Sequence, residues 1–347
     1  MKTLRTKLLY LAALALAGAT AASPALAQTT YTLEATPKNI TWGHFDGTTK
    51  PVLRIKSGDT VVFHTLLTNS PEGLEAAGLP PADVQPELRT IFREVTTDKG
   101  PGSHILTGPV YVEGAEPGDT LEVRIKKIDL AIPYAYNMFA PGMGFQADDF
   151  RYKRVRIIPL DKTTGTAHFG PGIEVPMHPF FGDMGVAPPL SMGRISSGPP
   201  TIIGGNMDNK ELTVGTSVFF PVYAPGAMFQ IGDGHAGQGN GEVDVTALET
   251  SLVGAMEFVL HKGEKTGPYP RAETPTHFIS MGFDDDLSTA AHKAVAGMID
   301  FLVEHKHMTR DDAYMLISVS GDIDITELVD SNKGVHVMLP KSVFVGK

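Results

Sequence analysis

Short strands separated by polar turns are predicted from Tyr31 to about Ile125 by the alternation of apolar and polar positions. Two units of strand, turn and strand fit this pattern: 52–55, 56–59 and 60–63, and then 110–112, 116–119 and 120–125. Such spacing, with Gly, Pro and Asp in the turns, is typical of β-sandwiches and barrels. We therefore expect a β-sandwich or barrel-like module, with a short helix inserted at about Pro81–Phe92.

Helical periodicity is confined to the C-terminal part of the chain. Apolar residues from Leu287 to Val303 recur at helical spacing and predict a helix from Ser288 to about Glu304. Thr309 begins a capping box for a second helix through about Ile317. Paired strands are expected at 243–259, and a final strand at 334–339. The predicted fold class is mainly β with an α+β C-terminal portion, its sandwich or barrel-like modules packed as one unit.

Residues 126–200 are rich in proline, glycine and aromatic side chains. This composition disfavours long helices and suits the wall of a ligand pocket, because aromatic side chains supply apolar area at small entropic cost. Irregular core packing beneath long loops explains it equally well. The pattern leaves both interpretations open.

The N-terminus has the pattern of a secretory signal peptide. Three cations, Lys2, Arg5 and Lys7, precede an apolar run from Leu8 to about Ala17, and Ala25–Ala27 supplies a small-residue cleavage site. We expect residues 1–27 to be removed and the mature chain to be exported, most simply to a periplasm. Residues 28–347 would form one catalytic domain, with a β module at about 28–200 and a β plus helical part at about 201–347.

Composition narrows the classes of partner and of chemistry. The chain has no cysteine, which excludes disulfides and a thiol nucleophile. Its formal charge of −10 becomes −13 when the three cations of the leader are removed. An acidic protein of this kind is not expected to bind nucleic acid, or a membrane after processing.

One stretch near the middle concentrates groups that bind metals or move protons. Asp208, Asp233, His235 and Glu242 lie among glycines in the segments 204–210 and 229–242. The apolar run 217–223 and a turn at 225–226 separate these segments, which predicts two polar loops joined by strands at one end of a sheet.

A mononuclear metal site is the leading hypothesis, with His104, Asp208 and His235 as ligands. A catalytic zinc ion takes about three N or O ligands and keeps one position open for water. His104 is chosen because it precedes the strand 109–111, whose Pro-Val-Tyr sequence recurs at 221–223 before the His235 loop. Calcium is the alternative ion, because Asp and Glu of the same stretch offer hard oxygen ligands.

Two glutamates are candidates for the catalytic acid or base. Glu113, on the strand that follows His104, is preferred, and Glu242 is the competitor. Nucleophilic serine catalysis is disfavoured. Ser196-Ser197-Gly198 lacks a flanking glycine run and a paired lysine motif, and the sequence has no Gly-x-Ser-x-Gly.

Four ordered motifs resemble the acetamidase/formamidase family: 104–119, 179–188, 204–208 and 232–242. The resemblance extends from about Asn39 to Phe344. It implies a mainly β fold, hydrolysis of the C–N bond of small linear amides to ammonia and a carboxylate, a divalent metal expected to be zinc, and a homo-oligomer. Within this framework we expect five residues to line the substrate pocket: Phe180, Phe181, Met184, Asp233 and Gln238.

Two other functions fit the same sequence. One is an exported, non-catalytic binding protein with a structural metal and the aromatic segment as its ligand groove. The other is hydrolysis of cyclic amides or ureas at the same site. The acyl pocket, which would separate linear from cyclic substrates, depends on how residues 126–200 fold.

Overall fold

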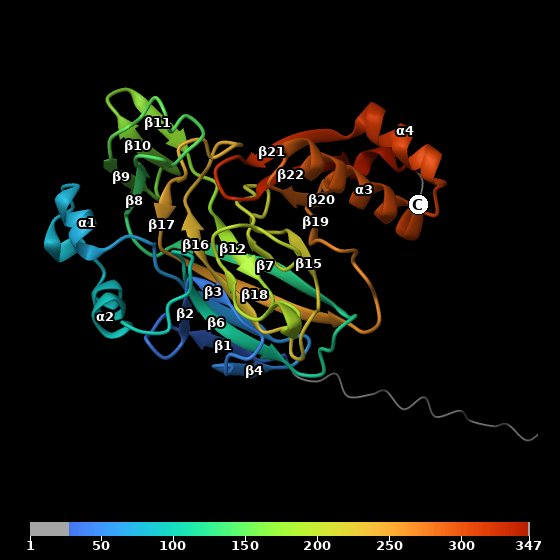
Figure 1. The fold of residues 1–347 in the computed structure, drawn as a ribbon, viewed down its shortest axis with the longest axis horizontal. Coiled ribbons are helices and arrows are strands. Elements are labelled where there is room, and N and C mark those ends of the chain that lie inside the picture. The colour runs from blue at the N-terminus through green and yellow to red at the C-terminus, as the bar shows by residue number, and fades with distance from the viewer. Residues whose placement is uncertain (1–27, 346–347) are drawn as a thin grey trace, which may run out of the picture.

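Two large, mainly antiparallel sheets form the body of the protein (Figure 1). The computed structural model describes residues 28–345, so the predicted signal peptide lies outside the described residues. In order across the first sheet, the strands are β1 (Thr30–Leu33), β5 (Thr60–His64), β18 (Leu252–His261), β7 (Thr120–Leu130), β15 (Ser217–Pro221), β19 (Arg271–Glu273), β20 (His277–Asp284), β22 (Lys333–Pro340) and β21 (Asp322–Glu327).

The second sheet contains Asp233 and His235, both on β16. Its main path is β11 (Ile173–Pro176), β10 (Thr166–Gly170), β9 (Arg154–Asp161), β8 (Tyr134–Phe139), β17 (Glu249–Thr250), β16 (Phe229–His235), β12 (Phe180–Gly185) and β14 (Gly204–Asn206). Strand β6 (Ile105–Val112) also pairs with β16, and with β2 (Ile40–Trp42) and β4 (Leu53–Ile55). Strands β3 (His44–Phe45) and β13 (Ile195–Ser196) form a separate pair.

The main core lies between the two sheets. Phe229 of the second sheet packs edge-on against Phe63 and Phe258 of the first, with ring centroids 5.9 and 5.2 Å apart. All three side chains are fully buried. Each can be buried without a polar penalty because Phe carries no hydrogen-bonding group. The mainly β fold class predicted from the sequence is confirmed.

Both predicted strand–turn–strand units run from one sheet to the other. β4 and β6 belong to the second sheet, whereas β5 and β7, which follow the two turns, belong to the first. Further along the chain, β15 pairs with β7 and β16 pairs with β6. Both sheets therefore contain strands from before and from after residue 200, and these strands share one core.

Four α-helices are seen in residues 28–345: α1 (Pro71–Ala76), α2 (Pro86–Glu94), α3 (Leu287–Lys306) and α4 (Arg310–Ser320). Short 3₁₀ helices occur at η1 (Pro81–Asp83), η2 (Leu190–Met192) and η3 (Lys341–Val343). α3 packs on β20 and β22, at the opposite end of the molecule from α1 and α2 (Figure 1). Within residues 28–345, none of the helices is long and apolar enough to cross a membrane.

The predicted C-terminal helices are confirmed. Asp286 caps α3 by accepting the Thr289 N–H, and Thr309 caps α4 by accepting the Asp312 N–H. The helix expected at Pro81–Phe92 is instead split into η1 and α2. Each part begins with a proline, which suits the first turn of a helix but not its interior.

Irregular packing beneath long loops, one of the two interpretations of residues 126–200, is wrong for much of the segment. Strands β8 to β12 run through it and join the second sheet. Aromatic residues here occupy strand positions, such as Tyr134 and Tyr136 on β8. The periodicity is hard to recognise in the sequence because glycine and proline interrupt it. Strands β8 to β11 pair with their neighbours along the chain, whereas β12 pairs with β14 and β16.

Candidate functional site

A buried cluster of carboxylates and imidazoles lies where β14, β12, β16 and β17 meet side by side. Strand register aligns its members, because residues directly opposite on adjacent strands bring their side chains together. His235 on β16 lies opposite Phe180 on β12 and Glu249 on β17. Asp183 on β12 lies opposite Asn206 on β14.

Asp208, Asp233 and His235 form the centre of this cluster. Each offers one donor atom, and the three atoms lie within 4.8 Å of one another. From His235 Nε2 the distance is 3.1 Å to an Asp233 oxygen and 3.9 Å to an Asp208 oxygen. His235, Glu242 and Glu249 form an overlapping second group within the same limit. Asp208 and His235 were predicted as metal ligands, and the fold brings them together.

Backbone conformation at these residues is unusual. Asp208, Asp233 and Glu242 all have positive φ angles, of 45°, 52° and 43°. This left-handed region is sparsely populated by residues other than glycine and costs on the order of 1 kcal/mol or more. Such strain is retained where the surrounding structure requires a particular side-chain direction, and here it occurs at three acidic groups of one cluster.

Gln238 fixes the orientation and the tautomer of His235. Its Nε2 donates a hydrogen bond of 2.7 Å to the Asp208 carbonyl oxygen, so its Oε1 is the atom that lies 3.0 Å from His235 Nδ1. An amide oxygen only accepts, which means that Nδ1 carries the proton. His235 Nε2 is therefore the nitrogen that faces the carboxylates, the arrangement usual for a metal-ligating histidine.

His104 lies at the edge of the same cluster. Its Nδ1 is 2.9 Å from the Ser197 carbonyl oxygen and 3.3 Å from an Asp183 oxygen, while its Nε2 is 4.0 Å from Asp233. Burial lowers the pKa of His104, but the charges of Asp233 and Asp183 outweigh burial and raise the pKa to about 10. His104 therefore faces the Asp233 side of the centre.

The C-terminal part of the chain completes the cluster. The Gly241 N–H donates to the Thr326 carbonyl oxygen, and the Leu328 N–H donates to that of Gly241, which docks the end of β21 against the 239–242 loop. Asp330 is thereby placed so that Asn206 Nδ2 donates to both Asp208 and Asp330, each at 2.7 Å.

Acidic groups outnumber cations in this buried region, and their pKa values reflect it. Burial raises the pKa of Asp183 and of Asp330 to about 6, and that of Glu327 to about 8. Burial also raises the pKa of Asp208 and of Glu242, in the latter case helped by the charge of Asp208. A buried excess of carboxylates is stable only if protons or a cation neutralise it.

Asp233 and His235 differ from this trend. Burial raises the pKa of Asp233, but the neighbouring His235 and His104 outweigh burial and bring the pKa below its ordinary value. Burial lowers the pKa of His235, and the charges of Glu249 and Asp233 reverse this effect and raise the pKa well above its ordinary value.

Two observations indicate that the donor set fits a divalent metal ion. First, Asp208 Oδ1, His235 Nε2 and both Asp183 carboxylate oxygens are buried without a hydrogen-bond partner. Second, Gly182 leaves space between the ligands: a Cβ atom there would lie 2.5 Å from Asp208 Oδ1 and 2.6 Å from Asp233 Oδ2. Mixed imidazole and carboxylate donors suit zinc and similar ions.

Glu113, the preferred catalytic base, is placed away from this cluster. His104 and Glu113 flank opposite ends of β6, so the eight residues of this strand lie between them and they are about 30 Å apart along the chain. The Glu113 side chain is 43% exposed, and its carboxylate pairs with Arg54 at 2.6 Å. That assignment is therefore corrected. Glu242, the competitor, lies in the cluster.

The predicted substrate pocket is corrected in two of its five residues. Phe181 and Met184 belong to the main hydrophobic core. Asp233 is one of the central donors, and Gln238 positions His235. Phe180 remains beside the reactive groups, edge-on to the His235 ring at a centroid distance of 5.0 Å.

Sequence reasoning missed Asp183, Glu249, Glu327 and Asp330. Asp183 carries a detectable signal, because a single carboxylate stands in the otherwise apolar and glycine-containing run Phe180–Gly185. The other three have no distinguishing neighbours in the sequence. They join the cluster through strand register and through the docking of β21.

Comparison with known proteins places the chain in a family. The sequence model of the Acetamidase/Formamidase family matches residues 93–198 and 194–345, which together include most of the described chain. The chain belongs to the Acetamidase/Formamidase family. All the cluster residues named above lie within the matched region.

Two relatives and one solved structure illustrate the similarity within the Acetamidase/Formamidase family. A formamidase from Methylophilus methylotrophus is 31% identical over 215 residues, 47% of this chain and 51% of that protein. An acetamidase from Mycolicibacterium smegmatis is 31% identical over 298 residues, 62% of this chain and 73% of that protein. The chain thus spans about half the length of the formamidase.

The solved structure is an acetamidase from Yersinia enterocolitica. It superposes with a TM-score of 0.78 at 28% sequence identity, covering 91% of this chain and 93% of the other. The similarity therefore extends over both sheets and the C-terminal helices, and is not limited to the residues of the cluster.

Proposed function

We propose that this protein hydrolyses the C–N bond of small linear amides in a metal-dependent reaction that releases ammonia and a carboxylate. The observation that carries the proposal is the convergence of Asp208, Asp233 and His235 over the space at Gly182 in a member of the Acetamidase/Formamidase family. The names formamidase and acetamidase of the two relatives support the choice of linear amides.

Asp208, Asp233 and His235 would hold the metal, and His104 Nε2 lies 4.0 Å from the Asp233 carboxylate. We propose zinc, since calcium prefers a shell made of oxygen ligands alone. When bound, such an ion polarises a carbonyl oxygen and lowers the pKa of water toward about 7. Gln238 keeps His235 Nε2 available as a donor, and Asn206 holds the second oxygen of Asp208.

Glu242 is the proposed proton carrier. Its carboxylate belongs to the group within 4.8 Å of His235, and burial raises its pKa above the ordinary value for glutamate. A raised pKa suits a group that takes a proton from water and passes it to the departing nitrogen, because amines leave poorly without protonation. Glu249 is less suited, since the Ala247 N–H already donates to it at 2.7 Å.

Small substrates are favoured by the enclosure of the cluster. Asp208 and His235 are each only 1% exposed, and the Phe180 ring packs against the imidazole of His235. Phe180 is therefore the aromatic residue proposed to limit the acyl group, whereas Phe181 and Met184 shape the core behind it. A closed, partly apolar site strengthens electrostatic interactions with the reacting group.

Three further points stay predictions: export to a periplasm, processing after residue 27, and assembly into a homo-oligomer. N-terminal sequencing of the secreted protein tests the first two, since the mature chain should begin at Gln28. Size-exclusion chromatography with light scattering tests the third.

The function is tested by measuring ammonia release from formamide, acetamide, propionamide and a lactam. The mature protein is assayed as purified, after chelation, and after addition of zinc or calcium. We expect release from the linear amides, its loss on chelation, and its recovery with zinc. If the folded protein releases no ammonia from any amide while metal is bound, hydrolysis is excluded and a binding function replaces it.

A further inference from the structure

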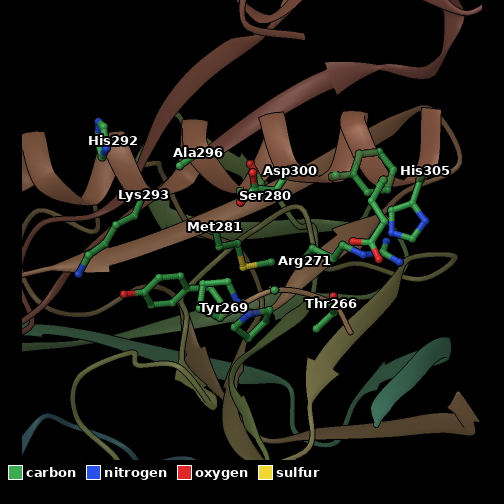
Figure 2. Close-up of a pocket in the computed structure, with 16 residues that line it drawn as sticks. Thr266, Tyr269, Arg271, Ser280, Met281, His292, Lys293, Ala296, Asp300 and His305 are labelled. Atoms are coloured by element: carbon green, nitrogen blue, oxygen red, sulfur yellow. The ribbon is translucent and has the colours of Figure 1, made fainter. Parts of the chain in front are cut away.

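A cavity apart from the carboxylate cluster lies between α3 and the segment 266–271, on the first sheet. Its volume is about 160 Å³. Figure 2 shows Thr266, Tyr269 and Arg271 on one side and His292, Ala296 and His305 of α3 on the other. Its lining shares no residue with the carboxylate cluster, which makes it a separate site.

Arg271 is fixed in the wall of this cavity. Its guanidinium carbon lies 3.7 Å from the Phe219 ring centroid and 5.1 Å from that of Phe301. Its Nη1 donates to Glu273 at 2.8 Å, and the side chain is only 15% exposed. Stacking on aromatic rings and one ion pair restrict the guanidinium to a single plane.

Two polar groups at this cavity are buried without a partner. Arg271 Nε has no acceptor, and Thr266 Oγ1 has neither a donor nor an acceptor. Leaving such a group unsatisfied costs about 1–3 kcal/mol, and more when it is charged. A guanidinium whose Nη1 side is occupied still presents its other edge, which matches the two oxygens of a carboxylate.

Charge balance at the cavity leaves Arg271 only partly neutralised. Glu273 is shared between Arg271 and Lys341, whose Nζ lies 3.3 Å away. Two cations therefore share the Glu273 carboxylate, while the more distant charges of Glu122 and Glu264 also act on Arg271. Of the other charged lining residues, Asp300 pairs with Arg310 at 2.6 Å and Lys293 pairs with Asp284 at 2.5 Å. Glu304 opposes an anion, and burial and the charge of Arg271 lower the pKa of His305, which therefore adds little positive charge near neutral pH.

The remaining wall is apolar. Met281, Ala296, Phe301 and Pro268 line it, and Gly297 leaves room beside them. One charged edge beside an apolar wall suits an anion that has a small hydrocarbon part. A phosphate, which carries more charge and no apolar part, would find too few donors here.

We propose that this cavity binds a short aliphatic monocarboxylate, with its carboxylate on the Nε edge of Arg271 and the Thr266 hydroxyl, and its chain against Met281 and Ala296. Binding does not depend on the proposed function. Acids of this class are, however, what the proposed hydrolysis releases, so the cavity would bind product away from the carboxylate cluster.

Isothermal titration of the chelated mature protein with propionate tests this proposal. We expect saturable binding with a Kd in the millimolar range or tighter. Thr266→Val, nearly the same in shape, should weaken binding several-fold, and Arg271→Lys, which keeps the charge but loses the fork, should weaken it about tenfold or more. Arg310→Lys, at an exposed ion pair outside the cavity, is the matched control and should bind as the wild type does.

Asp208→Asn changes the carboxylate cluster but not the cavity, so it should leave propionate binding unchanged. The proposal is overturned if the wild type gives no saturable heat, if both cavity variants bind as the wild type does, or if Asp208→Asn abolishes binding. Phosphate binding as tightly as propionate would also overturn the assignment to a monocarboxylate. Thermal melts of each variant establish that the protein is folded, and Thr266→Val provides the test if Arg271→Lys is not.

Discussion

His235 Nδ1 lies 3.0 Å from Gln238 Oε1, and this contact determines which nitrogen of His235 faces the carboxylates. Gln238 Nε2 donates a hydrogen bond to the Asp208 carbonyl oxygen, and this bond fixes which end of the Gln238 amide faces His235. One side chain thus connects the backbone of one proposed ligand with the ring of another. The contact explains why a glutamine is found among the glycines of this loop.

Gln238→Met should weaken metal binding without unfolding the protein. The thioether fills a similar volume but offers neither the acceptor for His235 Nδ1 nor the donor for Asp208. Loss of such a contact to a ligand lowers metal affinity about 10–100-fold. Competition with a chromophoric chelator measures the change. An affinity equal to that of the wild type would show that Gln238 does not position His235.

Gly182→Ala should abolish metal uptake. The added Cβ would occupy the space 2.5 Å from Asp208 Oδ1 and 2.6 Å from Asp233 Oδ2. We expect activity to fall at least about 100-fold, as for other displaced catalytic groups, with the metal content measured by mass spectrometry. Gly239→Ala is the control, because nothing lies within 4 Å of a Cβ at that position. Full metal content in Gly182→Ala would place the ion elsewhere.

Glu242→Gln should reduce turnover about 10²–10⁴-fold, the usual contribution of a general acid–base group. Glu113→Gln is the matched control and should keep wild-type activity, since its carboxylate pairs with Arg54 at the surface. Steady-state kinetics with acetamide measure both variants. The reverse outcome, with only Glu113→Gln inactive, would restore the base predicted from the sequence.

Glu327 should make the stability of the chelated protein depend on pH. Burial raises its pKa in the folded state to about 8, from 4.5. The folded state therefore keeps a proton that the unfolded state loses between these values. Stability falls as pH rises through this window, by at most about 1.4 kcal/mol per pH unit.

Glu327→Gln, which resembles the protonated acid, should remove this contribution. The difference in the free energy of unfolding between variant and wild type should then grow from pH 5 to pH 8, measured by urea denaturation. Glu113→Gln is the control. Its difference from the wild type in the free energy of unfolding should stay constant over this range, because Arg54 holds the pKa of Glu113 below its usual value. A constant difference for Glu327→Gln would contradict the raised pKa.

Local patterns in the sequence were enough to predict some elements. The apolar stripe and the Thr309 cap predicted α3 and α4 to within a few residues, because helices depend on contacts three or four residues apart. The glycine-rich stretch likewise pointed to Asp208 and His235, which do lie together.

Other features depend on pairing between distant segments. Glu249 reaches His235 only because β17 pairs with β16, and Asp330 reaches Asn206 only because β21 docks on the 239–242 loop. Glu113 was misplaced because closeness to His104 along the chain does not persist across an extended strand. Asp233 and His235 were expected in a loop, but they belong to β16.

The most direct test of the account is a metal titration of the chelated mature protein with acetamide turnover and bound zinc measured on the same samples. We predict that ammonia release rises in proportion to bound zinc, saturates at one ion per chain, and stays absent in Asp208→Asn. Full turnover by metal-free protein, or zinc bound at one equivalent with no turnover of any amide, would contradict it.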